Sequence, residues 1–208
     1  MNFSIHGSED QLTLQKNLLL KYVDKLVIKK EAAHSLEMGG VFSSENLFIR
    51  QIKECDKPIY KQLFTDPEIT KYTGEVINED QITTCFNKSI NELSAIPVQY
   101  ITWVVQIKES GESIGILNLA LHNNSIHSGE LEIILTKDYQ NRGYGSELLE
   151  RFINYFLIDK GISLLFCFAL NENEAASHIL SKFTFKKIKE NTFEKSKLDG
   201  CYWVLDRD

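Results

Sequence analysis

Apolar residues follow two different periods along the chain, and the period changes near residue 40. Between residues 10 and 38 they recur near the 3.6-residue spacing of an amphipathic helix, with lysines and acidic residues between them. Gly39 and Gly40 are then expected to end the helix and to form a hinge. The pattern predicts a helical extension over residues 1–42 and a folded domain over residues 43–208.

Beyond residue 43, alternating strand patterns are interleaved with helical ones. Strands are expected over residues 46–52, 100–107, 114–121, 130–135, 164–170, 185–193 and 201–205. Helices are expected around Ile59 and Pro67, from the Asn78–Gln81 capping box to Leu93, and over residues 144–160 and 174–183. The strand, helix and strand between residues 130 and 170 predict a crossover with parallel strands, while the other hairpins are antiparallel. The predicted fold class is α/β, with a mixed sheet flanked by helices.

Composition and charge narrow the class of protein. The chain has 208 residues, of which 43% are hydrophobic and 25% charged, as in a soluble globular protein with a sizeable core. Its net charge of −6 disfavours nucleic acid as a partner. The extension carries five lysines and five acidic residues, so it is a poor membrane anchor. Its apolar stripe is expected to pack on the main domain or on a second subunit, which would make a homodimer.

Neither a metal site nor a membrane partner is expected. The four cysteines, Cys55, Cys85, Cys167 and Cys201, lack CxxC-like spacing, and the histidines show no pattern of metal ligands. The first ten residues lack the build of a signal peptide, and no apolar run is long enough to span a membrane. We therefore expect reduced thiols and a cytoplasmic location.

The segment that carries chemistry is Gln-Asn-Arg-Gly-Tyr-Gly-Ser, residues 140–146, between a predicted strand and a predicted helix. Gly143 and Gly145 permit positive φ and close approach of a ligand, so successive amides can converge on an anion at the positive end of the helix dipole. Arg142 adds a charge. The alternative is that the glycines only make a tight turn. The dinucleotide fingerprint is excluded because Leu148 stands where its third glycine belongs, and no Walker A tripeptide occurs.

The Gln-x-x-Gly-x-Gly pattern resembles the acetyl-CoA pyrophosphate loop of the GNAT N-acetyltransferase superfamily. Further likeness to its ribosomal-protein N-terminal acetyltransferase branch, the RimJ/RimL type, is carried by Glu45–Arg50, by Thr65–Tyr72 with its Asp-Pro-Glu, by Trp103 with Ile114-Gly115, and by Asn173–Phe185. The resemblance covers roughly residues 44–206, in the expected order.

The resemblance implies a GNAT fold, in which a central, twisted, mostly antiparallel sheet contains two parallel strands that splay apart. The pantetheine arm of acetyl-CoA lies in that opening, between residues 133–136 and 166–170, and coenzyme A leaves as product. The residues implied to contact the cofactor are Leu135, Thr136, Gln140, Asn141, Arg142, Gly143, Tyr144, Gly145, Ser146, Asn171 and Asn173. Backbone N–H groups near Leu135 are the implied oxyanion donors.

Direct acetyl transfer to an amine needs a group that accepts the amine proton. Glu130 and Glu132 are the candidates, because they open the strand that leads into the loop and alternation places both on one face. Glu130 matches a position where the family often has glutamate. The alternative is that both are solvent-facing strand residues.

The proton donor to the leaving thiolate departs from the family pattern. Leu180 stands where many members have a tyrosine, and Ala176 stands where the RimJ/RimL branch often has a serine. Ser177 is the candidate that takes over this role, or else it is a surface serine.

The leading functional hypothesis is an acetyl-CoA-dependent N-acetyltransferase whose acceptor is a protein N-terminus or a small primary amine. The two early helices and the loop at about residues 191–200 are expected to form the acceptor cleft. The missing tyrosine and serine leave an alternative, which is a GNAT-like module that binds acyl-CoA as a sensor or scaffold.

Overall fold

The computed structural model describes residues 40–73, 77–92, 100–122, 125–188 and 199–206. The predicted helix of residues 10–38 lies outside the described residues, so the helical extension and its boundary at residue 42 stay predictions. The loop at about residues 191–200, expected to line the acceptor cleft, also lies largely outside them.

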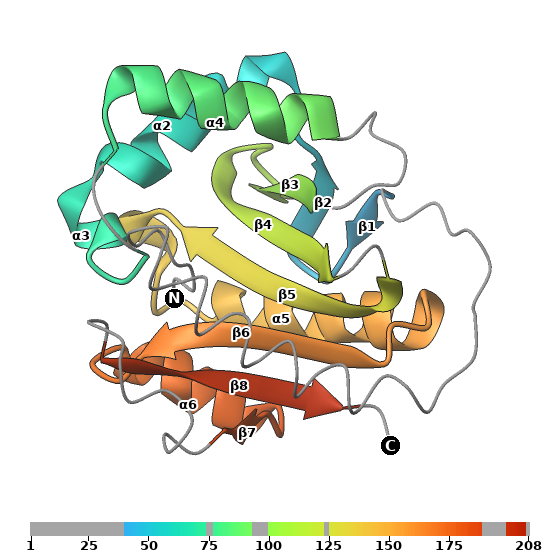
Figure 1. Ribbon diagram of the computed structural model, residues 1–208. Helices are drawn as coiled ribbons and strands as arrows, with labels where there is room; N and C mark the ends of the chain where they lie inside the picture. The colour runs from blue at the N-terminus through green and yellow to red at the C-terminus, as the bar shows by residue number, and fades with distance from the viewer. Residues whose placement is uncertain (1–39, 74–76, 93–99, 123–124, 189–198, 207–208) are drawn as a thin grey trace.

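The described residues form one mixed sheet of eight strands in the order β1-β2-β3-β4-β5-β6-β8-β7 (Figure 1). The strands are β1 (Phe42–Ser43), β2 (Leu47–Gln51), β3 (Tyr100–Ile107), β4 (Ser113–His122), β5 (Ser125–Leu135), β6 (Leu164–Leu170), β7 (Lys186–Lys187) and β8 (Gly200–Asp206). Only the β5–β6 pairing is parallel, and the other neighbours are antiparallel. The predicted mixed sheet with one parallel crossover is therefore confirmed.

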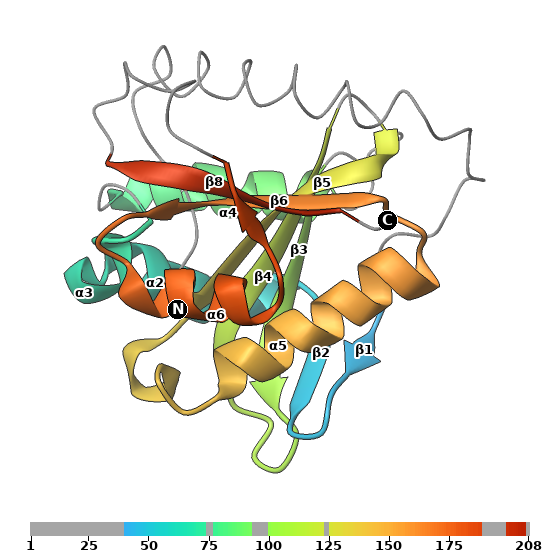
Figure 2. The same ribbon diagram turned by 90° about the horizontal axis from the view of Figure 1, so that it is seen from below.

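Helices cover both faces of this sheet. The main ones are α2 (Lys57–Thr65), α3 (Pro67–Thr70), α4 (Glu79–Glu92), α5 (Tyr144–Ile153) and α6 (Glu174–Lys182). Apolar residues of α2 and α4 pack with Val104, Ile116 and Ile134 of the sheet. Residues of α5 and α6 pack against the opposite face, in a larger cluster that includes Leu117 and Ile133. Figures 1 and 2 show the two helical layers on either side of the sheet.

The observed elements depart from the predicted ones at their ends. Strand β5 begins at Ser125 rather than at residue 130, and the two-residue β1 is too short to give a pattern. The predicted helix over residues 144–160 is an α-helix to Ile153 followed by a π-helix, Asn154–Asp159. In this wider turn, Tyr155 stacks on Phe42 with ring centroids 4.3 Å apart. The predicted strand over residues 185–193 is seen only at β7, because residues 189–193 lie outside the described part.

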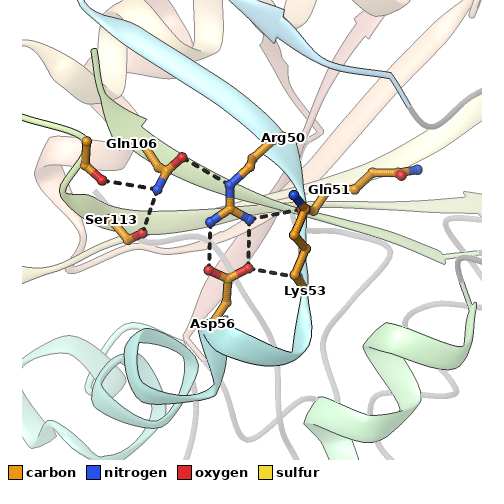
Figure 3. Close-up of polar contacts among 7 residues, drawn as sticks. Arg50, Gln51, Lys53, Asp56, Gln106 and Ser113 are labelled. Carbon is orange, nitrogen blue, oxygen red and sulfur yellow. Dashed lines mark hydrogen bonds and ion pairs between the residues drawn. The ribbon is translucent and has the colours of Figure 1, made fainter. Parts of the chain in front are cut away.

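An ion pair between a half-buried arginine and a buried aspartate fixes the start of α2 on the sheet. Arg50 of β2 makes two hydrogen bonds to Asp56, of 2.7 and 2.8 Å, and its Nε donates to Gln106 of β3 at 3.0 Å (Figure 3). The Asp56 carboxylate also accepts from the amide of Lys53 at 2.7 Å. Because Tyr60 of α2 packs in the same apolar cluster as Ile134 of β5, this network fixes α2 over that face of the sheet.

We expect Asp56→Asn to lower the free energy of unfolding by about 3 kcal/mol, because it leaves the Arg50 charge without its partner in a site where the two side chains are 14% and 5% exposed. The control is Glu79→Gln, which removes the Lys61–Glu79 pair, whose side chains are 48% and 63% exposed. That change is expected to cost less than about 1 kcal/mol. Denaturant unfolding of both variants measures the difference, and equal losses would show that burial of the Arg50–Asp56 pair is irrelevant.

Candidate active site

The two parallel strands are paired over only part of their length. Register pairs join Ser128 to Leu164, Gly129 to Leu165 and Glu130 to Phe166. Beyond the last pair, β5 continues to Leu135 and β6 to Leu170 without pairing each other, and Figure 1 shows them diverging. The sheet is therefore open on the side of β6 along the second half of β5.

The backbone of β5 turns alternate residues toward this opening. The amide of Thr136 donates to the carbonyl of Ile114 on β4 at 2.9 Å. In an antiparallel ladder the hydrogen-bonded pairs alternate, so even-numbered residues here face β4, while Ile133 and Leu135 direct their backbone groups to the β6 side. An extended ligand in the opening can hydrogen-bond with this edge as an added strand would.

The loop after β5 presents a row of amides at the start of α5. Asn141 has a φ of 58° and Gly143 a φ of 89°, and α5 begins at Tyr144. None of the backbone amides of residues 141–146 donates to another group in the described part of the chain. A Cβ at Gly143 would meet no atom within 4 Å, so the space beside this glycine is open. Amides without a protein partner at a helix N-terminus can bind an anion, so this loop is the candidate anion cradle.

Two contacts hold this loop in place. The Gln140 side chain donates from Nε2 to the carbonyl of Leu135 at 2.9 Å, which closes the loop onto the end of β5. Glu147, in the first turn of α5, accepts from the hydroxyl of Ser44 at 2.6 Å and from the amide of Asn46 at 2.7 Å. Burial raises the pKa of Glu147, but these hydrogen bonds outweigh it, so its pKa is lowered and its carboxylate stays charged.

A cavity of about 280 Å³ lies where the loop meets α3 and the start of α6. Its lining residues are Glu68, Lys71, Tyr72, Lys137, Gln140, Asn141, Glu172, Asn173, Glu174 and Ala175. Three predicted cofactor residues, Gln140, Asn141 and Asn173, are thus brought together. The sequence interpretation missed Lys71 and Lys137, which supply positive charge here, although Lys71 lies within the Asp-Pro-Glu segment that carried the family resemblance.

The other predicted cofactor residues occupy different surroundings. Arg142 is exposed, with its guanidinium carbon 5.4 Å from the centre of the Tyr139 ring, and it makes no ion pair among the described residues. The side chain of Asn173 caps α6 by accepting from the amide of Ala176 at 3.1 Å. Asn171 donates to Asp199 at 2.7 Å and accepts from Lys187, so it ties the end of β6 to β8 and lies outside the cavity lining.

The two candidate carboxylates lie on the sheet face that α2 and α4 cover. They alternate with Leu131 and Ile133 of the opposite face, and Ile134, two residues on, packs with α2 and α4. Both side chains are half-buried. Glu130 stands at the last β5–β6 pair, and Glu132 follows it inside the opening.

Glu132 has polar neighbours on the adjacent strands. Its Oε2 accepts from Asn118 Nδ2 at 2.5 Å and from the Tyr100 hydroxyl at 3.5 Å. Burial, reinforced by the charge of Glu132, raises the pKa of Tyr100 well above its usual value, so Tyr100 remains a donor. Both of these donors contact the same carboxylate oxygen, Oε2.

The candidate acid, Ser177 of α6, does not line the cavity. Ser177 is half-buried and lies outside the cavity lining, and its amide makes an ordinary helical bond to the carbonyl of Asn173. Leu180 is fully buried in the core beneath α6 and has no proton to give. The role of Ser177 stays a prediction.

Sequence comparison decides the family. A model of the acetyltransferase (GNAT) domain matches residues 46–186. The chain belongs to the GNAT acetyltransferase family. This acetyltransferase is also 22% identical over 155 residues to the uncharacterized N-acetyltransferase YoaA of Bacillus subtilis, a match that covers 72% of the chain and 85% of the relative. The acetyltransferase activity expected from the sequence is therefore confirmed at the level of the family.

Solved structures share the fold of this acetyltransferase. Spermidine N-acetyltransferase from Vibrio cholerae, in complex with CoA and spermine, has a TM-score of 0.65 at 20% identity and covers 77% of this chain and 95% of its own. Ribosomal-protein-S5-alanine acetyltransferase from Vibrio fischeri has a TM-score of 0.66 at 16% identity and covers 81% and 97%. At these identities the likeness shows the GNAT fold, which confirms the predicted fold class.

The described residues show neither a metal-binding cluster nor a membrane-spanning helix. They contain no group of three or more histidine, cysteine, aspartate or glutamate residues able to hold a metal ion. Among the helices that the structure describes, none has the length and apolar character needed to cross a membrane.

Proposed function

We propose that the chain is an acetyl-CoA-dependent N-acetyltransferase of the RimJ/RimL-like type, which acetylates a primary amine by direct attack on the thioester. The observation that supports this most is the loop of residues 141–146, whose backbone amides donate no hydrogen bond among the described residues. The loop follows the part of β5 that does not pair with β6. A diphosphate needs such donors, and a pantetheine arm needs such an edge.

The residues present fit acetyl-CoA. The amides of residues 141–146 would hold the pyrophosphate, and Arg142, which lies over the Tyr139 ring, is an exposed cation of the same loop. Lys71 and Lys137 line the adjacent cavity together with three glutamates, and Lys137 pairs with Glu68 at 3.8 Å. Both lysines are exposed cations that can contact phosphate oxygens. The backbone of Ile133 would pair with the pantetheine amides, while the carbonyl of Leu135 accepts from Gln140. When bound, the cofactor supplies the acetyl group as a thioester.

Glu132 is proposed as the group that takes the proton of the attacking amine. As the nitrogen bonds to the acetyl carbon and the carbon–sulfur bond breaks, one amine proton passes to the carboxylate, and the thiolate takes a proton from solvent or from Ser177. Glu132 is favoured over Glu130 because it lies inside the opening and has two donors on its Oε2. Glu130, at the apex of the opening, adds a second negative charge that favours a cationic acceptor.

The acceptor is proposed to be a small amine or a protein N-terminus. Two carboxylates on one half-buried face and the net charge of −6 favour a cationic amine. The two structural neighbours described above are named for one acceptor of each kind, a polyamine and a ribosomal protein. The homodimer and the cytoplasmic location expected from the sequence stay predictions.

The test is release of coenzyme A thiol from acetyl-CoA in the presence of single acceptors, namely spermidine, amino-acid amides, and peptides with N-terminal serine or alanine. We expect saturable release that requires one class of amine. The acyl-CoA sensor predicts a different result, in which acetyl-CoA raises the melting temperature but no acceptor releases thiol. That result would overturn the transferase proposal and leave cofactor binding intact.

A further inference from the structure

A row of polar side chains crosses the sheet beneath α2 and α4. The register of the ladders places Thr102 of β3 opposite Asn118 of β4, and Asn118 opposite Glu132 of β5. All three alternate with residues of the core under α5 and α6, so they lie on the same face as Val104, which packs with α2 and α4. The row therefore starts at the proposed base and leads away from the opening between β5 and β6.

Asn118 is buried but only half satisfied. The residue is 2% exposed, and its Nδ2 donates to Glu132. Its carbonyl oxygen, Oδ1, is fully buried and has no hydrogen-bond partner within the described part of the chain. Buried polar groups in proteins are nearly always paired, so a lone acceptor beside a candidate catalytic carboxylate points to a donor supplied by a ligand.

We infer that Asn118 positions both partners of the proton transfer: its amide N–H holds Glu132 Oε2, and its Oδ1 accepts a hydrogen bond from the acceptor amine. This inference rests on the proposed function. The side-chain amide is planar, so fixing its N–H on the carboxylate also fixes the direction of its oxygen. An attacking primary amine has two N–H groups, one for Glu132 and one for Asn118.

The contact from Asn118 is a hydrogen bond donated to the carboxylate of the proposed base. A donor that bonds the charged form of a carboxylate lowers its pKa, and a carboxylate must be charged to take a proton. Among the described residues, titratable groups that face Glu132 include Tyr100 from β3, Tyr60 from α2 and Glu130 on its own strand, and Cys85 of α4 faces Tyr60. None of them replaces the 2.5 Å contact from Asn118.

The test is the titration of Glu132 in the intact chain labelled with ¹³C-glutamate, observed by NMR at the side-chain carboxyl carbon and assigned by its loss in Glu132→Gln. We expect Asn118→Leu, which is close to isosteric, to raise the midpoint of Glu132 by about one to two pH units. The pH profile of kcat/KM is measured with the amine that supports thiol release. Its acidic limb is expected to shift to higher pH by the same amount as the Glu132 midpoint. Asn118→Ser provides the measurement if the leucine variant fails to fold.

Thr102→Val is the matched control. Thr102 is buried in the same row and its hydroxyl also lacks a partner in the described residues, but Asn118 separates it from Glu132. This variant is expected to leave the midpoint unchanged. An unchanged midpoint and limb in both Asn118 variants would overturn the inference. If instead Glu132→Gln leaves the acidic limb in place, the base assignment of the proposed function fails, which is a separate outcome.

Discussion

An aspartate in place of Gly143 is expected to weaken acetyl-CoA binding by at least about 100-fold. The glycine lies at the start of α5 among the amides of residues 141–146, and the space beside it is open, so the new carboxylate would occupy the position proposed for the pyrophosphate. Placing like charges together costs several kcal/mol, and about 2.7 kcal/mol corresponds to a 100-fold change. Titration calorimetry with coenzyme A measures the loss directly.

Backbone strain has to be separated from this effect, because Gly143 has a positive φ of 89°. Gly111, in the turn between β3 and β4, has a φ of 71° and likewise no atom within 4 Å of an added Cβ. Gly111→Asp therefore introduces the same residue with similar strain at a distance from the loop. We expect it to lower stability about as much as Gly143→Asp and to keep full affinity. Equal affinities in the two variants would refute the cradle.

Removing the proposed base is expected to have the second large effect. Glu132→Gln keeps the size of the side chain and a polar contact to Asn118, but it cannot take a proton. We expect kcat to fall by about 10²- to 10⁴-fold, the usual contribution of a general base, while the affinity for coenzyme A stays the same. The acidic limb of the pH profile should disappear together with the activity.

Glu130→Gln distinguishes between the two carboxylates. Glu130 lies one step along the same face, at the end of the paired part of β5 and β6. Its loss should raise KM for a cationic amine more than it lowers kcat, because Glu130 is proposed to attract the amine by its negative charge and not to accept a proton. A larger fall in kcat for Glu130→Gln than for Glu132→Gln would reverse the assignment.

The local parts of the site were predictable from the sequence. Two glycines between a strand and an amphipathic helix indicated the loop, and the structure places the open amides there. The Asn78–Gln81 capping box is present, with reciprocal bonds of 2.9 and 3.0 Å. Each of these features depends on residues a few positions apart, so local periodicity and turn chemistry specify them.

The contacts between strands could not be predicted in the same way. Pairing of Asn118 with Glu132 depends on the register of β4 and β5, which an irregularity between Leu121 and His122 shifts. A one-residue slip would turn either side chain to the other face. The ion pair of Arg50 and Asp56 was missed for a related reason, since its geometry needs Gln106 of β3 beside it. Lys71 and Lys137 meet at the cavity only through the placement of α3.

A crystal structure of the chain with coenzyme A tests the central claim most directly. It should show pyrophosphate oxygens within hydrogen-bonding distance of backbone nitrogens in residues 141–146, and the pantetheine arm alongside Ile133 and Leu135 between β5 and β6. Coenzyme A bound with its pyrophosphate away from this loop, or with its pantetheine arm outside the opening, would contradict the account.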